Sequence, residues 1–315
     1  MSLSRVALIT ISLLCLIFLA YLSSFYFQIN NENQSEVIQN PVELKIGFIT
    51  DIHAKSNSIK KVKTNRFIKE EYLTKIDYFK KELEQGFGPD IIVNNGDVIE
   101  GTNRDSVVGK IELSLIKDSF KEFSAPTLWV TGNHDLRAVA KDQWKESLGI
   151  DYLWKAFELN GYKIIILDSN FNLENQNIEP DRYYTRGRLS DLELKWLEAE
   201  LKKDDKKSLI FLHHPPLNYY NATSNSQFLK NAIDFQNIVS RQGNVLAVFS
   251  GHVEEIHHKE IQGVHYFVIP GTTKNPDFQG TFAKIRVLNS EVSVTLFYQD
   301  QTGKYKTKNI TALDE

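Results

Sequence analysis

The chain has 315 residues, of which 42% are hydrophobic and 24% are charged, a composition typical of a globular protein that builds its own core. Its formal net charge of −3 gives no electrostatic footprint for nucleic acid, so no nucleic-acid binding is expected. Cys15 is the only cysteine, which excludes an intramolecular disulfide.

Residues 1–27 are predicted to form a membrane anchor. The run Val6–Phe27 is almost wholly apolar, and a helix needs about 20 such residues to cross a bilayer. Arg5 precedes the run and no Lys or Arg follows it before Asn40, so the positive-inside rule places the rest of the chain outside the cytoplasm. A cleaved signal peptide, which would make the protein secreted, is the alternative, but the small residues of a cleavage site are missing. Residues 28–43 are predicted to be a polar tether.

From residue 44 onward, apolar runs typical of buried strands alternate with amphipathic stretches typical of helices. Asn160-Gly161 is a hairpin-turn sequence. Ser190, followed three residues later by Glu193, is a capping-box pattern that starts a helix. The predicted strands of this part are 44–50, 90–95, 127–131 and 162–167, and the predicted helices are 66–85, 106–123 and 190–203.

The last third of the chain changes in character after its final predicted helix. Strands at 208–212 and 245–250 flank a helix at 227–241, and four strands with hairpin spacing follow at 256–262, 264–269, 282–288 and 292–298. This order predicts a mixed α/β layered core over residues 44–299 that ends in an antiparallel set of strands. Residues 300–315 are predicted to be a polar, peripheral tail.

Five short polar motifs each follow an apolar run that is typical of a strand. They are Asp51-Ile52-His53, Gly96-Asp97, Gly132-Asn133-His134-Asp135, His213-His214-Pro215 and Gly251-His252. Open α/β sheets bind ligands at the carboxyl ends of their strands. Asp, Asn and His side chains together suit Mn²⁺, Fe and Zn²⁺. Two such cations about 3.5–4 Å apart polarise a phosphoryl group and make hydroxide from a bound water. The motifs therefore indicate a site for two divalent metal ions.

This ordered set of motifs resembles the calcineurin-like metallophosphoesterase superfamily, from residue 44 to about residue 288. The segments Asn133–Arg137 and His213–Pro216, with Gly187–Ser190 leading into a helix that contains Trp196-Leu197, are similar to the class III cyclic-nucleotide phosphodiesterase branch. The resemblance implies a four-layer α/β/β/α sandwich, which the predicted transmembrane helix precedes in this chain.

The resemblance also implies a role for each site residue. Asp51, His53 and Asp97 would hold the first metal, and Asp97 would bridge to the second. His134 would stand beside the phosphoryl group as an acid or charge stabiliser, with Asp135 orienting it. The second metal would be held by Asp97, Asn133, His213 and His252.

One position departs from the pattern of the superfamily. Where relatives read Gly-His-x-His, this chain has Glu254 in place of the second histidine. Residues two apart on a strand exit point the same way, so this carboxylate is expected to face the metals with His252. A carboxylate is a harder donor than imidazole, so it favours Mn²⁺ or Fe over Zn²⁺. His257 and His258 are alternative ligands if the loop bends back.

The leading hypothesis is a membrane-tethered phosphoesterase outside the cytoplasm that hydrolyses a phosphate ester by attack of metal-bound hydroxide, with diesters favoured. The alternative is a non-catalytic binding or scaffold protein on the same fold with a degenerate metal site, which only Glu254 favours. Specificity is expected in the longer loops near the motifs, at 54–65, 102–108, 170–186 and 219–225. Arg137, Arg182 and Arg186 are expected either to meet a phosphate oxygen or to form salt bridges.

Overall fold

The computed structural model describes residues 42–56, 68, 70–102, 104–178, 180, 186–217, 227–272 and 279–311. The chain divides into the units Met1–Val42 and Glu43–Glu315, and nearly all described residues belong to the second unit. The predicted anchor at 1–27 and most of the predicted tether lie outside the described residues. Within the described ranges, no helix has both the length and the apolar character needed to cross a membrane.

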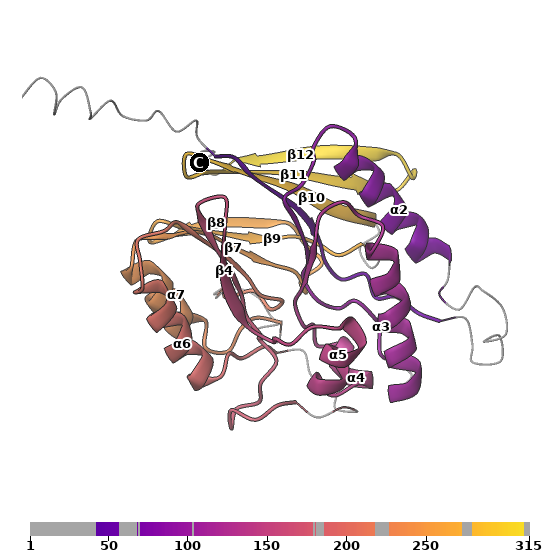
Figure 1. Ribbon diagram of the computed structural model, residues 1–315, viewed down its shortest axis with the longest axis horizontal. Helices are drawn as coiled ribbons and strands as arrows, with labels where there is room; N and C mark the ends of the chain where they lie inside the picture. The colour runs from indigo at the N-terminus through magenta and orange to yellow at the C-terminus, as the bar shows by residue number, and fades with distance from the viewer. Residues whose placement is uncertain are drawn as a thin grey trace, which may run out of the picture. The chain divides into compact units, whose positions relative to one another are not determined.

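The described strands form two six-stranded sheets (Figure 1). The first sheet has the order β12-β11-β10-β1-β2-β3, with β1 Leu44–Ile49, β2 Ile91–Asn94, β3 Thr127–Trp129, β10 Gln279–Leu288, β11 Glu291–Gln299 and β12 Tyr305–Thr311. The second has the order β4-β5-β6-β7-β9-β8, with β4 Lys155–Leu159, β5 Tyr162–Ile166, β6 Ser208–Phe211, β7 Val245–Ser250, β8 His257–Ile261 and β9 Val264–Val268. Strands β1, β2 and β3 are parallel, as are β5, β6, β7 and β9, so each set gathers its carboxyl ends at one edge.

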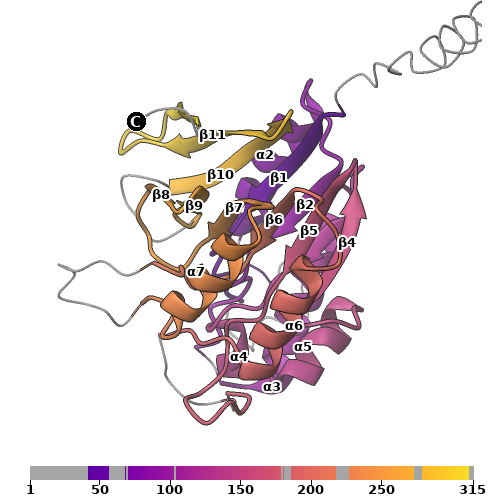
Figure 2. The same ribbon diagram turned by 90° about the vertical axis from the view of Figure 1, so that its left-hand side faces the viewer.

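Helices cover the outer faces of both sheets. Figure 1 shows α2 and α3 on one side of the sheets and α6 and α7 on the other, and Figure 2 shows α6 and α7 in front of the second sheet. The described helices are α2 Glu70–Glu84, α3 Ser106–Phe120, α4 Asp135–Ala138, α5 Lys141–Leu148, α6 Asp191–Leu201 and α7 Ala232–Arg241.

The described side chains form three apolar clusters that separate these layers. One cluster, which includes Phe79, packs α2 and α3 against the first sheet. A second lies between the sheets, where the rings of Phe48 and Phe211 are 6.3 Å apart. The third, which includes Leu197 and Phe235, packs α6 and α7 against the second sheet. The order of layers is that of the predicted α/β/β/α sandwich.

The local signals at the turn before β5 and at the start of α6 have different outcomes. The hairpin turn is confirmed, because Asn160 and Gly161 have φ of 51° and 79° and β4 pairs antiparallel with β5. Ser190 caps α6 by accepting the N–H of Glu193 at 3.2 Å. The Glu193 carboxylate, however, accepts the N–H of Asp168 at 2.7 Å, so it binds the segment that follows β5 instead of completing the capping box.

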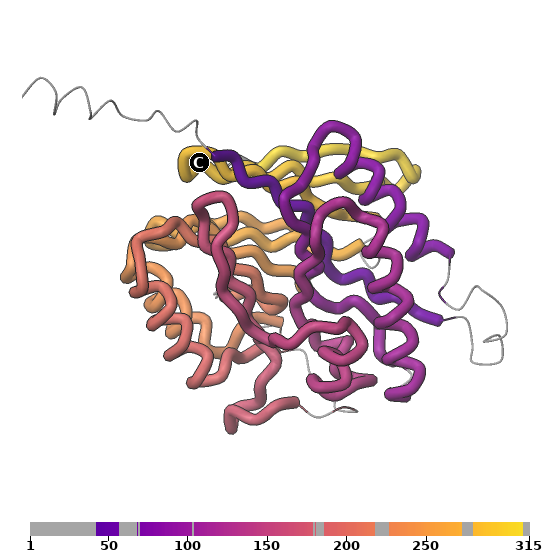
Figure 3. Tube along the Cα trace, viewed as in Figure 1, coloured from indigo at the N-terminus to yellow at the C-terminus, as the bar shows by residue number. Residues whose placement is uncertain are grey.

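The C-terminal strands do not form one antiparallel set. Strands β8 and β9 are antiparallel to each other, but β9 lies parallel to β7 in the second sheet. Strand β10 joins the first sheet beside β1, and Figure 3 shows this yellow segment next to the indigo start of the described domain. The prediction of a tail after Asp300 is corrected, since β12 pairs with β11 as the edge strand. Its mostly exposed, polar sequence carries no apolar pattern.

Candidate metal centre

The predicted site motifs all lie just beyond the carboxyl ends of parallel strands. Asp51 and His53 follow β1, Asp97 follows β2, and the segment 133–135 follows β3 in the first sheet. His213 and His252 follow β6 and β7 in the second sheet. The two sheets meet at these ends, because the N–H of His252 donates to Asp51 Oδ2 at 3.0 Å.

Several of these residues have a positive φ, a backbone conformation that residues other than glycine rarely adopt. Asp51, His53, Asp97 and His252 have φ of 51°, 49°, 52° and 66°. This conformation costs about 1–3 kcal/mol per residue. It persists only where the surrounding structure enforces it, most often at functional sites. The strain supports a role for this cluster beyond packing.

Asp51, His53 and Asp97 form one buried group that could hold a metal ion. The Nε2 atom of His53 lies 3.5 Å from Asp51 Oδ1 and 3.7 Å from Asp97 Oδ2. Each carboxylate uses its other oxygen for a backbone hydrogen bond; Asp97 Oδ1 accepts the N–H of His134 at 2.7 Å. The oxygens that face the imidazole are therefore held in place by the loops around them.

A second set of donors surrounds His213. Its Nε2 atom lies 3.3 Å from Asp97 Oδ2, 3.2 Å from Asn133 Oδ1 and 3.2 Å from His252 Nδ1. Its Nδ1 atom lies 3.0 Å from the carbonyl oxygen of Asn95, which orients the ring so that Nε2 faces the other donors. Asp97 Oδ2 thus lies between the imidazoles of His53 and His213.

The burial of carboxylates against imidazoles shifts their pKa values. Burial by itself disfavours the charged form of His53, but Asp51, Glu100 and Asp97 raise its pKa to about 9. Burial likewise disfavours charged His213, but Asp97 and Asp51 raise its pKa to about 9. For Asp97, burial favours the neutral form, and the facing His213 and His134 hold its pKa well below the ordinary value. The centre therefore favours positive charge between its carboxylates, and its oxygen and nitrogen donors fit divalent cations.

Glu254 lies beside the first group, in the direction predicted. Its Oε1 atom is 3.8 Å from His53 Nε2, and its Oε2 atom accepts the N–H of Gly271 at 2.9 Å. The alternative ligands are placed in β8, where His257 lies 3.0 Å from a Glu255 oxygen and His258 lies 3.2 Å from a nitrogen of His265. None of the groups of described residues that could hold a metal ion contains either of them, and none contains Glu254.

The surroundings of His134 differ from the prediction. Its Nε2 atom lies 3.8 Å from Asp97 Oδ2, and its Nδ1 atom lies 3.3 Å from Glu100 Oε1 and 2.6 Å from Arg137 Nη1. The side chains that orient the ring are therefore Glu100 and Arg137. Arg137 is buried and pairs within the protein, which is the salt-bridge alternative of the two predicted.

Asp135 does not orient His134 through its carboxylate. Its two oxygens accept the N–H groups of Ile99 and Gly132, each at 3.0 Å, so it joins the loops that follow β2 and β3. Burial and the charge of Asp97 raise the pKa of Asp135 to about 7. Glu100 is the site residue that the sequence pattern missed, although it follows the Gly96-Asp97 motif closely. Its Oε2 atom lies 3.2 Å from His53 Nδ1, so Glu100 contacts both His53 and His134.

The residues after β5 were also missed, although they follow an apolar strand as the other motifs do. Asp168, Ser169 and Asn170 are fully buried. Ser169 Oγ lies 2.8 Å from His214 Nδ1, and the Asn170 amide donates to the carbonyl oxygen of Thr131 at 2.9 Å. These bonds tie the end of β5 to the ends of β6 and β3, which carry His213 and Asn133.

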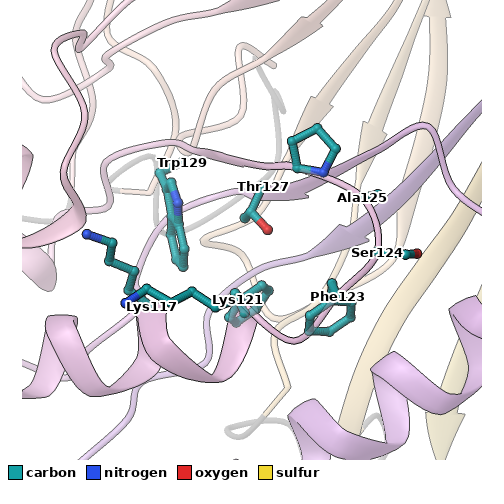
Figure 4. Close-up of a pocket in the computed structure, with 9 residues that line it drawn as sticks. Lys117, Lys121, Phe123, Ser124, Ala125, Thr127 and Trp129 are labelled. Atoms are coloured by element: carbon teal, nitrogen blue, oxygen red, sulfur yellow. The ribbon is translucent and has the colours of Figure 1, made fainter.

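A separate cavity of about 420 Å³ lies at the other end of β3. Figure 4 shows Lys117, Lys121 and Trp129 around it, and Thr127 on its wall opens β3 at the end remote from Asn133. This cavity is therefore not part of the metal centre.

Comparisons with known proteins agree with this geometry. A 3′,5′-cyclic-nucleotide phosphodiesterase of Nostoc sp. is 25% identical over 272 residues, covering 85% of this chain and 92% of that protein. A probable glycerophosphodiester phosphodiesterase of Arcobacter nitrofigilis is 30% identical over 175 residues, covering 53% of this chain and 58% of that protein. The structure of a dimetal phosphatase from Danio rerio superposes with a TM-score of 0.65 at 16% identity, covering 86% of this chain and 99% of that one, which supports the fold.

The family comparison covers the whole metal centre. Residues 44–254 match the family model of the calcineurin-like phosphoesterases. That range extends from the first residue of β1 to Glu254 and so includes every predicted metal ligand. The match, together with the buried donor groups, shows that the chain belongs to the calcineurin-like phosphoesterase family and is a binuclear metal-dependent phosphoester hydrolase.

Proposed function

We propose that the chain hydrolyses phosphate diesters at this centre. The observation that carries the proposal is the position of Asp97 Oδ2, which lies 3.7 Å from His53 Nε2 and 3.3 Å from His213 Nε2. One carboxylate between two donor sets is the arrangement needed to bridge two cations. Relatives named as cyclic-nucleotide and glycerophosphodiester phosphodiesterases support diesters as the substrate class.

The donors divide into two sets around the shared Asp97. The first cation would be held by Asp51, His53, Asp97 and Glu254, and the second by Asp97, Asn133, His213 and His252. Since the first set has three carboxylates and one imidazole, Mn²⁺ or Fe is favoured there over Zn²⁺. When bound, two such cations polarise a phosphoryl group and supply a nucleophile at neutral pH.

The residues of the chain would position and protonate the substrate. The His134 Nε2 atom lies 3.8 Å from Asp97 Oδ2, so it would stand beside a phosphoryl group held at the centre. From there the imidazole can donate a proton to the departing alcohol oxygen or stabilise charge on the phosphoryl oxygens. Glu100 and Arg137, both in contact with Nδ1, hold the ring in this orientation.

A location outside the cytoplasm is part of the proposal. The apolar run Val6–Phe27, preceded by Arg5 and followed by a stretch without basic residues, supports a single membrane anchor at 1–27. The substrate would then be a diester that is accessible from outside the cytoplasm.

Hydrolysis of model esters tests the proposed activity. The purified chain, stripped with a chelator and reloaded with Mn²⁺, is assayed with bis(para-nitrophenyl) phosphate and with para-nitrophenyl phosphate. The proposal predicts hydrolysis of both esters only after reloading, with the higher kcat/KM for the diester. Equal hydrolysis by stripped and reloaded protein would exclude the metal centre, and a preference for the monoester would exclude diesters as the substrate class.

A further inference from the structure

A cavity of about 400 Å³ lies between the loop that follows β5 and the segment that precedes α7. Its size suits a small organic group. The described residues that line it are Phe171, Asn172, Leu173, Glu174, Ile178, Arg186 and Lys230.

The backbone at Gly187 connects this cavity to the metal centre. Gly187 follows Arg186 and lies against His214 so closely that a Cβ atom there would be 2.4 Å from His214 Cγ. The ring centroids of His214 and His252 are 4.4 Å apart. On its other side, the carbonyl oxygen of Gly187 accepts the N–H of Lys230 at 2.8 Å. Gly187 therefore separates Arg186, on the cavity wall, from His214, which packs against the predicted metal ligand His252.

The apolar wall of the cavity is held in place by contacts of Phe171 with neighbouring segments. The Phe171 ring is buried, and the Lys141 ammonium lies 3.5 Å from its centroid. That ammonium is itself fixed by Asp168 at 2.6 Å, and the N–H of Phe171 donates to the carbonyl oxygen of Arg188 at 3.2 Å. Because these contacts exist in the free protein, little order would be lost when an organic group packs on this wall.

The charged side of the cavity carries two positively charged side chains that are not paired with acids among the described residues. Within the described part of the chain, neither the Arg186 guanidinium nor the Lys230 ammonium has a hydrogen-bonding or ion-pairing partner. The neighbouring Arg188 differs, because it pairs with Asp191 at 2.8 Å. Glu174 is the one acid among the described lining residues, so the lining carries two positive charges and one negative charge.

We propose that this cavity is the subsite for the second ester group of the diester, and that it selects a group combining a negative charge with an apolar or ring portion. Phe171 and Leu173 would pack on the organic portion, and Arg186 and Lys230 would pair with a carboxylate or a second phosphate. The proposal rests on the proposed function and adds to it the class of substrate, a diester with an anionic second arm.

A pair of matched esters tests the subsite. Para-nitrophenyl carboxypropyl phosphate and para-nitrophenyl butyl phosphate share a leaving group and differ in one terminal carboxylate. The Mn²⁺-loaded wild-type chain should hydrolyse the carboxypropyl ester with a kcat/KM about tenfold higher, the order of two exposed ion pairs. Arg186→Ala and Lys230→Ala should each lower this ratio, and the double variant should bring it to about one. Glu174→Gln should raise the ratio, and the control Arg241→Ala, at the far end of α7, should leave it unchanged.

Direct binding separates failure of the subsite from failure of the proposed function. Calorimetric titration of the Mn²⁺-loaded chain with each intact ester reports the subsite even when neither ester is hydrolysed. Tighter binding of the carboxypropyl ester that disappears in the double variant supports the subsite. Equal wild-type values for the two esters in both binding and hydrolysis would overturn it, as would an Arg241→Ala ratio that falls as far as that of the double variant. Absence of hydrolysis with a clear difference in binding would overturn the proposed activity alone.

Discussion

Glu254 faces His53 across the first set of donors, with 3.8 Å between Oε1 and Nε2. Its second oxygen accepts the N–H of Gly271 at 2.9 Å, so the same side chain ties the end of β7 to the segment after β9. If Glu254 is a ligand, Glu254→Ala should bind one Mn²⁺ as tightly as wild type and the other at least about tenfold more weakly. Calorimetric titration with Mn²⁺ measures both affinities.

Two further variants at position 254 separate the ligand role from the structural tie. Glu254→Gln keeps an acceptor for the Gly271 N–H but loses the charge, so it should retain wild-type thermal stability and still bind one metal weakly. Glu254→His should remain active and improve activity with Zn²⁺, because it restores imidazole at this place. If Glu254→Ala binds two Mn²⁺ ions as tightly as wild type, the carboxylate is not a ligand and only accepts the hydrogen bond from Gly271.

His134 and Asp135 are adjacent, but substitution of the first should lower kcat and substitution of the second should lower stability. His134→Ala removes the group beside the phosphoryl position and should lower kcat by about 10²–10⁴-fold, with two metals still bound. Asp135→Ala leaves the buried N–H groups of Ile99 and Gly132 without their acceptor, at about 1–3 kcal/mol each, so it should lower the free energy of unfolding. Denaturant unfolding and kcat for both variants check this division. A stable Asp135→Ala protein with the kcat defect of His134→Ala would restore the role first predicted for Asp135.

The sequence indicated the metal centre well because its signal is local. Asp51 and Asp97 each come shortly after an apolar run, and the missed Asp168 follows one directly, so the same rule would have found it. Glu100 was missed because its contact with His134 depends on how two loops fold together. The place of β10 beside β1 joins residues far apart in the chain, so it depends on packing that no local pattern encodes.

Glu193 gives stability a pH dependence that is separate from the metals. It is fully buried at the start of α6, and burial, followed by the charge of Asp168, raises its pKa well above the ordinary value of 4.5. Above pH 4.5 the unfolded chain releases this proton while the folded chain keeps it, so the contribution to stability falls as pH rises. Glu193→Gln keeps the acceptor for the Asp168 N–H and does not titrate. Its free energy of unfolding should therefore gain on wild type between pH 5 and pH 8 in urea titrations, and a constant difference would contradict a raised pKa.

The proposed orientation of the chain in a membrane rests on the charge pattern around residues 1–27. With an anchor at 1–27 and Arg5 on the cytoplasmic side, protease added to sealed spheroplasts should degrade the phosphoesterase domain. Protection of the domain would reverse the orientation. Recovery of a soluble protein with a new N-terminus would instead identify residues 1–27 as a cleaved signal peptide.

The central claim is that the Asp97 carboxylate joins two cation sites, and counting the metals bound to Asp97→Ala tests it most directly. Metal content per chain is measured after equilibration with Mn²⁺, with diester hydrolysis and circular dichroism on the same samples. Wild type should hold two Mn²⁺ ions, whereas folded Asp97→Ala should hold at most one tightly and hydrolyse no diester above background. A folded Asp97→Ala protein that holds two Mn²⁺ ions and turns over at the wild-type rate would contradict the two-metal centre.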